Sequence, residues 1–340
     1  MNGKDLSILI PSRNEMFLQN TIEDALKNIE ADTEIIVVLD GKSTNPPIPQ
    51  YERVNIIYVP EAIGQRAAQN LACKLSKAKY VMKVDAHCSF DKGFDRKMLE
   101  TFKEVGDDVT MVPIMRNLWA FDWKCMKCGK KWYQGPTPTK CQETNLKNTG
   151  KPCESTKFSR KMMWVGKSNP QSTSYCFNAE PHFQYFREYA KRLEYKNNLE
   201  EKGFTETMSL QGSCFMSTRK KYWELELCDE KLGNWGNQGI EVAVKTWLSG
   251  GRVLVNHRTW YAHMFRTQGG DFGFPWPASG NDIQKTKNKI KDLLWNNKPA
   301  SPSQGGWPKQ KYHLSWLIEK FWPVPGWTEE DLNKLKSSAL

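Results

Sequence analysis

The sequence has no long hydrophobic run. No stretch approaches the roughly 18 consecutive apolar residues that a membrane-spanning helix requires. The first residues, 1–5, lead directly into a strand-like segment and lack the charged, apolar and small-residue regions of a secretory signal. We therefore expect a cytoplasmic protein with no membrane partner.

The cysteine content does not favour a disulfide framework. There are nine cysteines, an odd number, and Cys125 and Cys128 have the Cys-x-x-Cys spacing typical of metal sites. Cys141 and Cys153 would complete a four-thiolate tetrahedral zinc site, although eleven residues separate them rather than two. The alternative is two unrelated pairs of free thiols. We expect the other five cysteines to be small core residues.

The composition is that of a globular protein with a basic surface. Hydrophobic residues make up 39% of the 340 residues, which excludes a disordered chain. The charge, 49 − 38 = +11, indicates an anionic partner. Between residues 116 and 167, twelve Lys or Arg face three acidic residues, a local charge of 12 − 3 = +9, with aromatic residues interleaved. This segment is predicted to be an insertion that binds a polyanion such as nucleic acid. The alternative is a solvated basic face on a zinc-stapled lid.

The first hundred residues alternate short apolar runs with helical patterns. This alternation predicts an α/β fold with a mostly parallel central sheet covered by helices on both faces. Ligands of such sheets bind beyond the carboxyl ends of the strands, where Asp40 and Asp85 fall. The predicted strands are Leu6–Ile10, Glu34–Leu39, Val54–Val59 and Tyr80–Val84, and the predicted helices are Thr21–Ile29 and Ala67–Ser76.

The sharpest local feature is Asp85-Ala86-His87 at the end of a buried strand. A carboxylate and an imidazole two residues apart can face one ion across a turn, and this ligand set suits Mn²⁺ or a similar divalent metal. The motif alone is weak, because a histidine near a strand end is often only a hydrogen-bonding residue.

The wider sequence resembles the GT-A glycosyltransferases, most closely the polypeptide N-acetylgalactosaminyltransferases and the family 2 enzymes. Ser7–Glu15 is similar to their first strand and nucleotide loop, which implies donor contacts from Pro11, Arg13 and Glu15. Val38–Gly41 resembles the strand whose Asp, here Asp40, contacts uracil. Ile63–Asn70 resembles the segment in which an Arg, here Arg66, approaches the nucleotide.

The resemblance continues near the C-terminus. Trp235–Glu241 has the order of the family block Trp-Gly-Gly-Glu-Asn-Leu-Glu, and Ala262–Arg266 resembles Gly-His-Val-Phe-Arg. The resemblance makes His263 the third metal ligand beside Asp85 and His87, and implies donor contacts from Trp235 and Arg266. Phe274-Pro275 and the helix-like Asn281–Trp295 resemble the mobile loop and helix that follow.

One position departs from the family block. Gln238 stands where the family has Glu, and an amide can bind a sugar hydroxyl but cannot act as a general base. Gln238 and Glu241 are nevertheless the candidate catalytic residues of this block, together with the metal ligands. The resemblance implies retention at the anomeric carbon, whereas inversion requires a base such as Glu241, Asp229 or Asp271. Gly212 lies in a segment similar to the family's acceptor-side loop; the alternative is a tight turn.

We therefore predict a metal-dependent glycosyltransferase that uses a UDP-sugar, with Mn²⁺ or Mg²⁺ at the catalytic site and structural Zn²⁺ in the insert. A basic sugar transferase without a membrane anchor resembles the phage-type enzymes that glycosylate 5-hydroxymethylpyrimidines in DNA, and the expected location is then the host cytoplasm. The alternatives are a protein, polysaccharide or lipid-linked glycan acceptor, and, more remotely, a non-enzymatic zinc-ribbon nucleic-acid-binding protein. The predicted parts are a nucleotide-sugar half (1–115), the inserted module (116–167), an acceptor-side half (168–300) and a Trp-rich tail (301–340).

Overall fold

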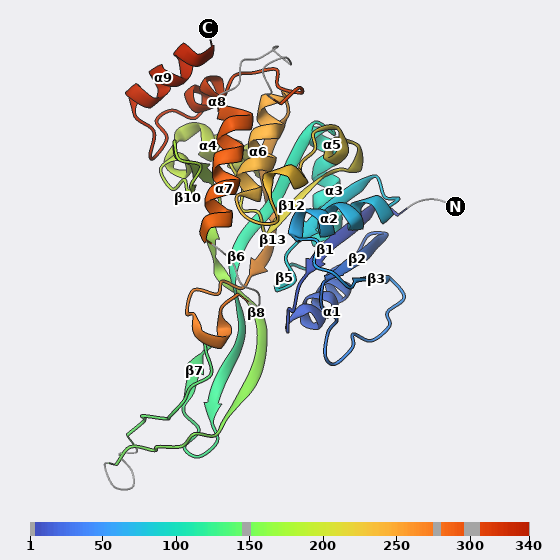
Figure 1. Ribbon diagram of the computed structural model, residues 1–340, viewed down its shortest axis with the longest axis vertical. Coiled ribbons are helices and arrows are strands. Elements are labelled where there is room, and N and C mark those ends of the chain that lie inside the picture. Colours follow the sequence, from blue (N-terminus) through green and yellow to red (C-terminus); the bar gives the residue numbers. More distant parts are fainter. Residues whose placement is uncertain (1–3, 145–150, 275–279, 296–306, 340) are drawn as a thin grey trace.

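The chain folds into a body of sheet and helices from which one long arm projects (Figure 1). The computed structural model describes residues 4–144, 151–274, 280–295 and 307–339. The C-terminal helices lie at the end of the body opposite the arm. None of the described helices combines the length and the apolar character needed to cross a membrane.

The first half of the body is a parallel sheet, as predicted. Its strands lie in the order β4-β1-β2-β3 with parallel pairing throughout. Because the strands are parallel, their carboxyl ends meet at one edge, which brings the residues after β1, β2 and β4 together. The elements are β1 (Leu6–Ser12), α1 (Leu18–Asn28), β2 (Thr33–Asp40), β3 (Val54–Val59), α2 (Gln65–Leu75) and β4 (Tyr80–Val84).

The second half extends this sheet with mixed pairing. Strand β12 (Cys214–Thr218) lies antiparallel between β4 and β6 (Val109–Cys125), and β6 is parallel to β13 (Arg252–His263). The short strand β5 (Cys88–Phe90) pairs with the end of β13, so that Cys88 lies opposite His263. This pairing brings the end of β13 beside the turn that follows β4.

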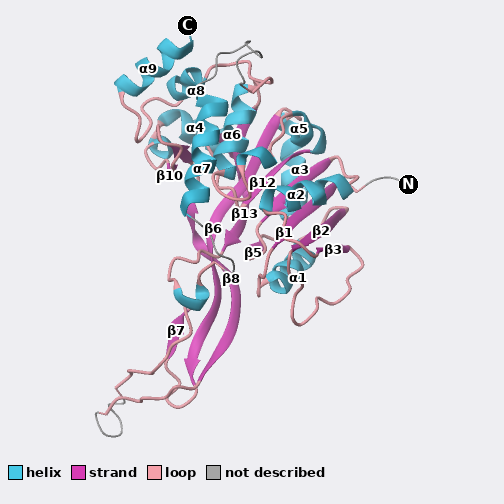
Figure 2. Ribbon diagram, viewed as in Figure 1, coloured by secondary structure: helices cyan, strands magenta, loops and turns pink. Residues whose placement is uncertain are grey.

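The remaining elements complete the layers seen in Figure 2, in which helices cover the upper sheet and strands dominate the arm. One large apolar cluster joins the sheet to the C-terminal helices, including Trp307 and Trp327 of the predicted tail. The first residues of that tail, 301–306, and Pro275 of the predicted mobile loop lie outside the described residues. The other helices and strands are α3 (Phe94–Val105), β9 (Tyr175–Phe177), β10 (Phe183–Tyr185), α4 (Leu193–Lys202), β11 (Phe204–Glu206), α5 (Arg219–Glu224), α6 (Gln238–Leu248), α7 (Gly280–Ile290), α8 (Leu314–Lys320) and α9 (Glu329–Ala339).

The arm is more regular than the sequence indicates. Strand β6 has 17 residues and β8 (Phe158–Ser172) has 15, and they form a long antiparallel pair with the short β7 (Lys131–Tyr133) on the other side of β6. The loss of a simple alternating pattern between residues 116 and 167 is explained by two register shifts within that range, between Arg116 and Leu118 and between Trp119 and Phe121. Such shifts break the two-residue period that identifies a strand.

A buried ion pair joins helices α2 and α6. Arg66 is 1% exposed and donates to the Glu241 carboxylate at 3.0 Å, and its other nitrogens donate to the carbonyl oxygens of Gly233 and Gly236. Glu241 also accepts from Lys245 at 3.0 Å. Arg66, which the sequence predicts to contact the donor, and Glu241, which it predicts to be catalytic, are thus bonded to each other inside the protein. Both side chains are fully engaged in the interior, where they hold the segment around Gly236 in place.

Substituting Glu241→Gln should strongly destabilise the protein, because it leaves Arg66 and Lys245 as buried charges without a carboxylate. We expect E241Q to lower the free energy of unfolding by about 3–5 kcal/mol, measured by urea denaturation. The control is E330Q, since Glu330 pairs with Lys334 on the surface, where such a change costs less than about 1 kcal/mol. A loss in E241Q as small as that in E330Q would contradict the role given to the buried pair.

Candidate active site and cysteine cluster

A cleft of about 650 Å³ opens at the carboxyl ends of β1, β2 and β4. Its volume is within the range of small-molecule sites. It is lined by nine of the predicted donor-binding residues and metal ligands: Pro11, Arg13, Glu15, Asp40, Asp85, His87, Trp235, His263 and Arg266. The sequence therefore identified the correct edge of the sheet.

Asp85, His87 and His263 converge in this cleft. The Nε2 atom of His263 lies 3.1 Å from Nε2 of His87 and 3.2 Å from Oδ2 of Asp85. One ligand atom from each residue lies within 4.8 Å of the others, close enough for all three to hold one ion. Two imidazole nitrogens and a carboxylate oxygen form a ligand set that fits Mn²⁺ and similar divalent cations.

The electrostatic surroundings favour the protonation states that bind metals. Burial lowers the pKa of His263 to about 4, so its imidazole is neutral at physiological pH and keeps a free lone pair. Burial alone would raise the pKa of Asp85, but the neighbouring Lys83 ammonium and His263 outweigh it and hold that pKa below its usual range. Asp85 is therefore a carboxylate.

Lys83 is a site residue that the sequence analysis missed. Its side chain is 1% exposed, and its ammonium donates to Oδ1 of Asp85 and, at 2.6 Å, to the Gly212 carbonyl oxygen. The Asp85 oxygen bonded to Lys83 is not the one nearest His263, so Lys83 orients the carboxylate. The sequence does contain a feature that could have identified Lys83, because it is the only charged residue in the otherwise apolar strand β4.

Glu15 and Arg266 line the cleft but are bound to each other. Arg266 donates to both oxygens of Glu15 at 2.6 and 2.5 Å, and Glu15 accepts from, or shares a proton with, Nδ1 of His87 at 3.0 Å. Arg266 therefore holds Glu15, and Glu15 holds His87, whereas the sequence predicts that both charged residues contact the donor. A carboxylate on the second nitrogen of a histidine is the usual arrangement behind a metal ligand.

Asp40 lines the cleft and orders its wall. Its two carboxylate oxygens accept from the backbone N–H groups of Ile63 at 2.6 Å and Gly64 at 3.1 Å. Gly64 has φ +91°, which favours glycine, and a Cβ there would meet Asn234 at 2.8 Å. Asp40, for which the sequence predicts a contact with uracil, therefore positions the turn before α2.

Gln238 and Gly212 lie at a smaller adjoining cavity of about 400 Å³. The Gln238 side chain is buried and donates inward to Gln69 at 2.8 Å and to the Cys228 sulfur at 3.1 Å. The amide nitrogen of Gln238, predicted to be a catalytic residue, is thus engaged within the protein rather than with the metal ligands. Gly212 packs closely on α6, since a Cβ there would lie 3.0 Å from the Gly239 nitrogen.

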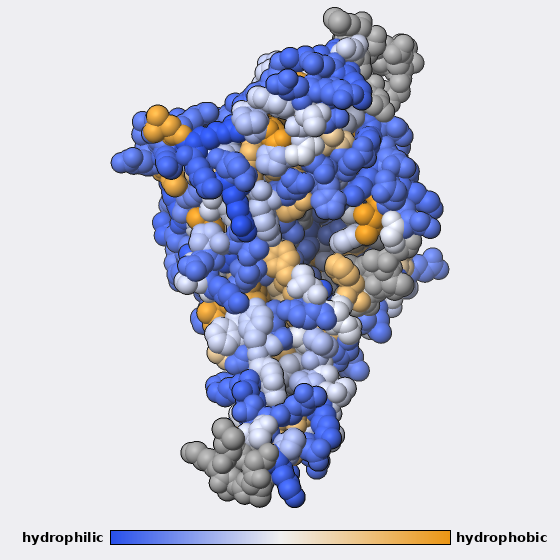
Figure 3. Space-filling view, turned by 90° about the vertical axis from the view of Figure 1, so that its left-hand side faces the viewer, coloured by the Kyte–Doolittle hydropathy of each residue, from blue (hydrophilic) through white to orange (hydrophobic). Residues whose placement is uncertain are grey.

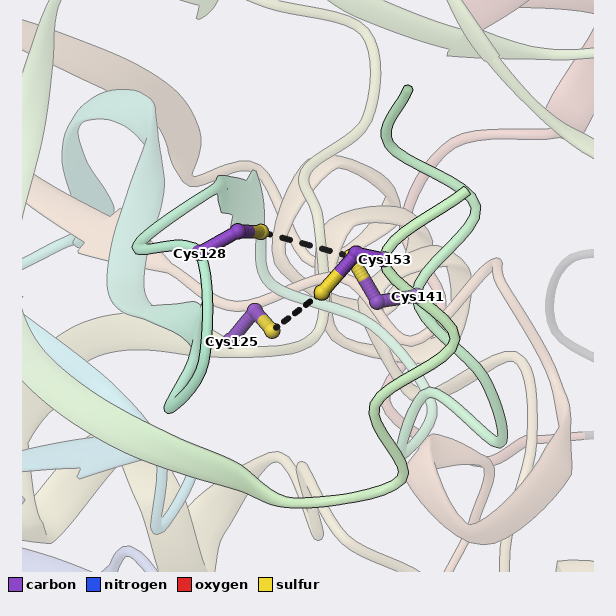
Figure 4. A group of neighbouring side chains, drawn as sticks. All are labelled: Cys125, Cys128, Cys141 and Cys153. Carbon is purple, nitrogen blue, oxygen red and sulfur yellow. Dashed lines mark hydrogen bonds between the residues drawn. The ribbon is translucent and has the colours of Figure 1, made fainter. Parts of the chain in front are cut away.

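The four predicted zinc cysteines meet in the outer part of the arm (Figure 4). Sulfur–sulfur distances are 3.7 Å for Cys125 and Cys153 and 3.6 Å for Cys128 and Cys141. Four sulfurs at about 2.3 Å from a central zinc ion would lie about 3.8 Å apart, so the cluster fits a tetrahedral thiolate site. These distances are too long for disulfides. Backbone N–H groups of Lys127 and Cys128 point at Cys125 and, against the effect of its burial, lower its pKa.

The base of the arm is fastened to the loop that borders the cleft. Asp271 accepts from the Thr137 backbone N–H at 2.9 Å and from its hydroxyl at 2.5 Å. Beside this contact, Phe272 packs edge-on against Phe121 at a centroid distance of 5.7 Å. Arg266, which begins the same loop, also donates to the Phe272 carbonyl oxygen at 3.4 Å. The arm and the cleft are therefore joined by direct contacts.

Comparisons with known proteins agree with this geometry. Residues 7–163 match the family model described as glycosyl transferase family 2. Polypeptide N-acetylgalactosaminyltransferase 3 of Drosophila melanogaster is 29% identical over 95 residues, which are 27% of this chain and 14% of that protein. The crystal structure of GalNAc-T7 with UDP, GalNAc and Mn²⁺ shares the fold with a TM-score of 0.59 at 15% identity, over 99% of this chain and 55% of that chain.

The chain thus spans little more than half of that solved relative's length. The match to the family model includes β1 to β4 and the Asp85-x-His87 turn, and the shared fold covers the rest of the body, including β13 with His263. Residues 7–163 are therefore similar to the family 2 glycosyltransferases, and the body shares the fold of GalNAc-T7.

Proposed function

We propose that this protein transfers a sugar from a UDP-sugar to an acceptor hydroxyl in a reaction that depends on a divalent metal ion. The observation that carries the proposal is the convergence of Asp85, His87 and His263 in a cleft at the carboxyl ends of the parallel strands. It is supported by the likeness to GalNAc-T7, whose structure contains UDP, GalNAc and Mn²⁺.

The three ligands would hold Mn²⁺ or Mg²⁺, which neutralises the charge of the diphosphate leaving group when it is bound. Lys83 and Glu15 keep Asp85 and His87 in their orientations. Arg13 lines the same cleft without an ion-pair partner among the described residues, so it is the cation best placed to meet a donor phosphate.

The same geometry supports retention at the anomeric carbon. Of the three carboxylates considered as bases for inversion, Glu241 is buried with Arg66, and Asp271 is bonded to Thr137. Asp229 accepts from the Lys231 backbone N–H at the start of a short helix. None of the three lies among the residues that line the cleft.

Removing a metal ligand should abolish turnover. D85N and H263A should each reduce metal-dependent UDP release, measured with a panel of UDP-hexoses and UDP-N-acetylhexosamines. The expected loss exceeds about 100-fold, because removal of a residue that only hydrogen-bonds a metal ligand already costs roughly 10- to 100-fold. D107N is the control, because Asp107 is half-exposed and pairs with Lys79 on the surface. Wild-type turnover in either ligand variant would refute the assignment of the site.

We propose a 5-hydroxymethylpyrimidine in DNA as the acceptor, because most of the excess positive charge lies in the arm. This proposal includes a cytoplasmic location, in the host cell if a phage encodes the protein, because the DNA is there. The hydroxyl of such a base has to be presented by flipping or by an unpaired strand.

The acceptor is tested by intact-mass analysis. Hydroxymethylated DNA incubated with the enzyme, metal and the correct UDP-sugar should gain the mass of one sugar per modified base, whereas plain DNA of the same sequence should not. A mass gain on a peptide, polysaccharide or lipid-linked glycan, with none on DNA, would refute the DNA acceptor and identify that molecule as the acceptor instead.

We also propose that Cys125, Cys128, Cys141 and Cys153 bind one structural Zn²⁺, which stabilises the end of an arm that has little apolar core of its own. Purified protein should contain about one zinc per chain by elemental analysis. C141A should lose it, and the control C176A, which removes a core thiol in β9, should keep it. Full zinc content in C141A would contradict the four-cysteine site.

A further inference from the structure

The strand register places several lysines on one face of the arm. Lys124 of β6 lies directly opposite Lys131 of β7, and Asp122 lies opposite both Tyr133 of β7 and Lys161 of β8. Residues directly opposite on neighbouring strands share a face, and so do residues two apart on one strand. These side chains therefore project from the same side of the three strands.

Two further residues extend this face toward the body. The Trp119 ring lies 6.0 Å from that of Tyr133 and its indole nitrogen donates to Asp122 at 2.8 Å, while the Lys167 ammonium lies 4.3 Å from the Tyr133 ring centre. We call the whole set the docking face. It consists of Trp119, Lys124, Lys131, Tyr133, Lys161 and Lys167.

The positive charges of the docking face are not neutralised within the protein. The exposed acids of the arm, Glu143 and Glu154, pair with Lys130 and Lys140 instead. Asp122 is 9% exposed and is engaged by Trp119. In the described part of the chain, no carboxylate forms an ion pair with the lysines of this face. Like charges directly opposite on two strands, as in Lys124 and Lys131, destabilise a sheet, and an external anion relieves that cost.

The opposite face of the arm is already occupied. Trp123, Trp132 and Phe158 pack there, Phe121 contacts Phe17 and Phe272, and Arg160 lies over the rings of Phe121 and Trp123. The docking face therefore differs from it in both charge and exposure. Figure 3 shows the outer part of the arm covered largely by hydrophilic residues.

We propose that the docking face binds a single strand of nucleic acid, here the DNA that carries the acceptor base. This inference rests on the proposed DNA acceptor. The lysines supply several positive charges for contacts with backbone phosphates. Tyr133, which is 40% exposed, and Trp119 offer ring surfaces to unpaired bases. Bases in a duplex are already stacked, so aromatic side chains on an open strand surface favour an unpaired strand. The contact between Asp271 and Thr137 keeps this face in a constant relation to the cleft.

The test is fluorescence anisotropy with zinc-loaded, full-length protein and a labelled 20-nucleotide single strand, without donor sugar. The triple variant K124E/K131E/K161E should bind at least tenfold more weakly, and the slope of log affinity against log salt should become shallower by about 2, since each phosphate contact contributes about 0.7. Y133A should lose about fivefold or more in affinity.

The control K74E/K77E/K196E makes the same change in charge at exposed lysines of the body and should bind like the wild type. An equal loss of affinity in both triple variants would overturn the proposal. So would tighter binding of a matched duplex, or of heparin, than of the single strand. The triple arm variant should release UDP from the donor at the wild-type rate. Absence of UDP release in the wild type would instead count against the transferase function, so the two failures are distinguishable.

Discussion

The buried contact between Lys83 and Asp85 is the constraint on which the cleft depends. An ammonium and a carboxylate in the interior are costly unless both are fully satisfied. Here Asp85 and the Gly212 carbonyl oxygen satisfy Lys83, and His263 approaches the second oxygen of Asp85. Strand β4, the turn before β12 and the end of β13 therefore have to come together for the charges to be paired. The pairing that solves the electrostatic problem also assembles the metal ligands.

A second group of charges supports the site from behind. Arg266 holds Glu15, Glu15 holds His87, and Arg66 with Glu241 holds the segment that includes Gly236. The family motifs led to donor contacts for three of these residues, Glu15, Arg66 and Arg266. In the structure, the charged groups of all three are bonded to other side chains of the protein. A motif identifies residues that meet in space, but it does not distinguish a side chain that faces the cleft from one that faces the protein behind it.

The sequence predicted the parallel half of the sheet well, for physical reasons, and the three residues expected to hold the metal converge in the structure. Strands β2 and β4 are almost entirely buried and form short apolar runs in the sequence, and helix α2 between them has a clear amphipathic period. Lys83 was missed because one of its two partners, the Gly212 carbonyl oxygen, lies in the turn before β12, far away in the sequence. The arm was predicted to be irregular because register shifts interrupt the alternation of apolar and polar residues along its strands. Its aromatic residues also belong to a cluster separate from the main core.

Strand β6 runs without interruption from the centre of the sheet to Cys125 beside the cysteine cluster. Successive side chains of a strand point to opposite sides, so the face that a residue of the arm occupies depends on whether its distance from the sheet is odd or even. A single-residue insertion or deletion in β6 beyond the core would transpose Lys124 with the aromatic Trp123 and turn Cys125 away from its partners. A change of one residue in the length of this part of β6 therefore has to be accompanied by a β-bulge if both faces of the arm are to be kept.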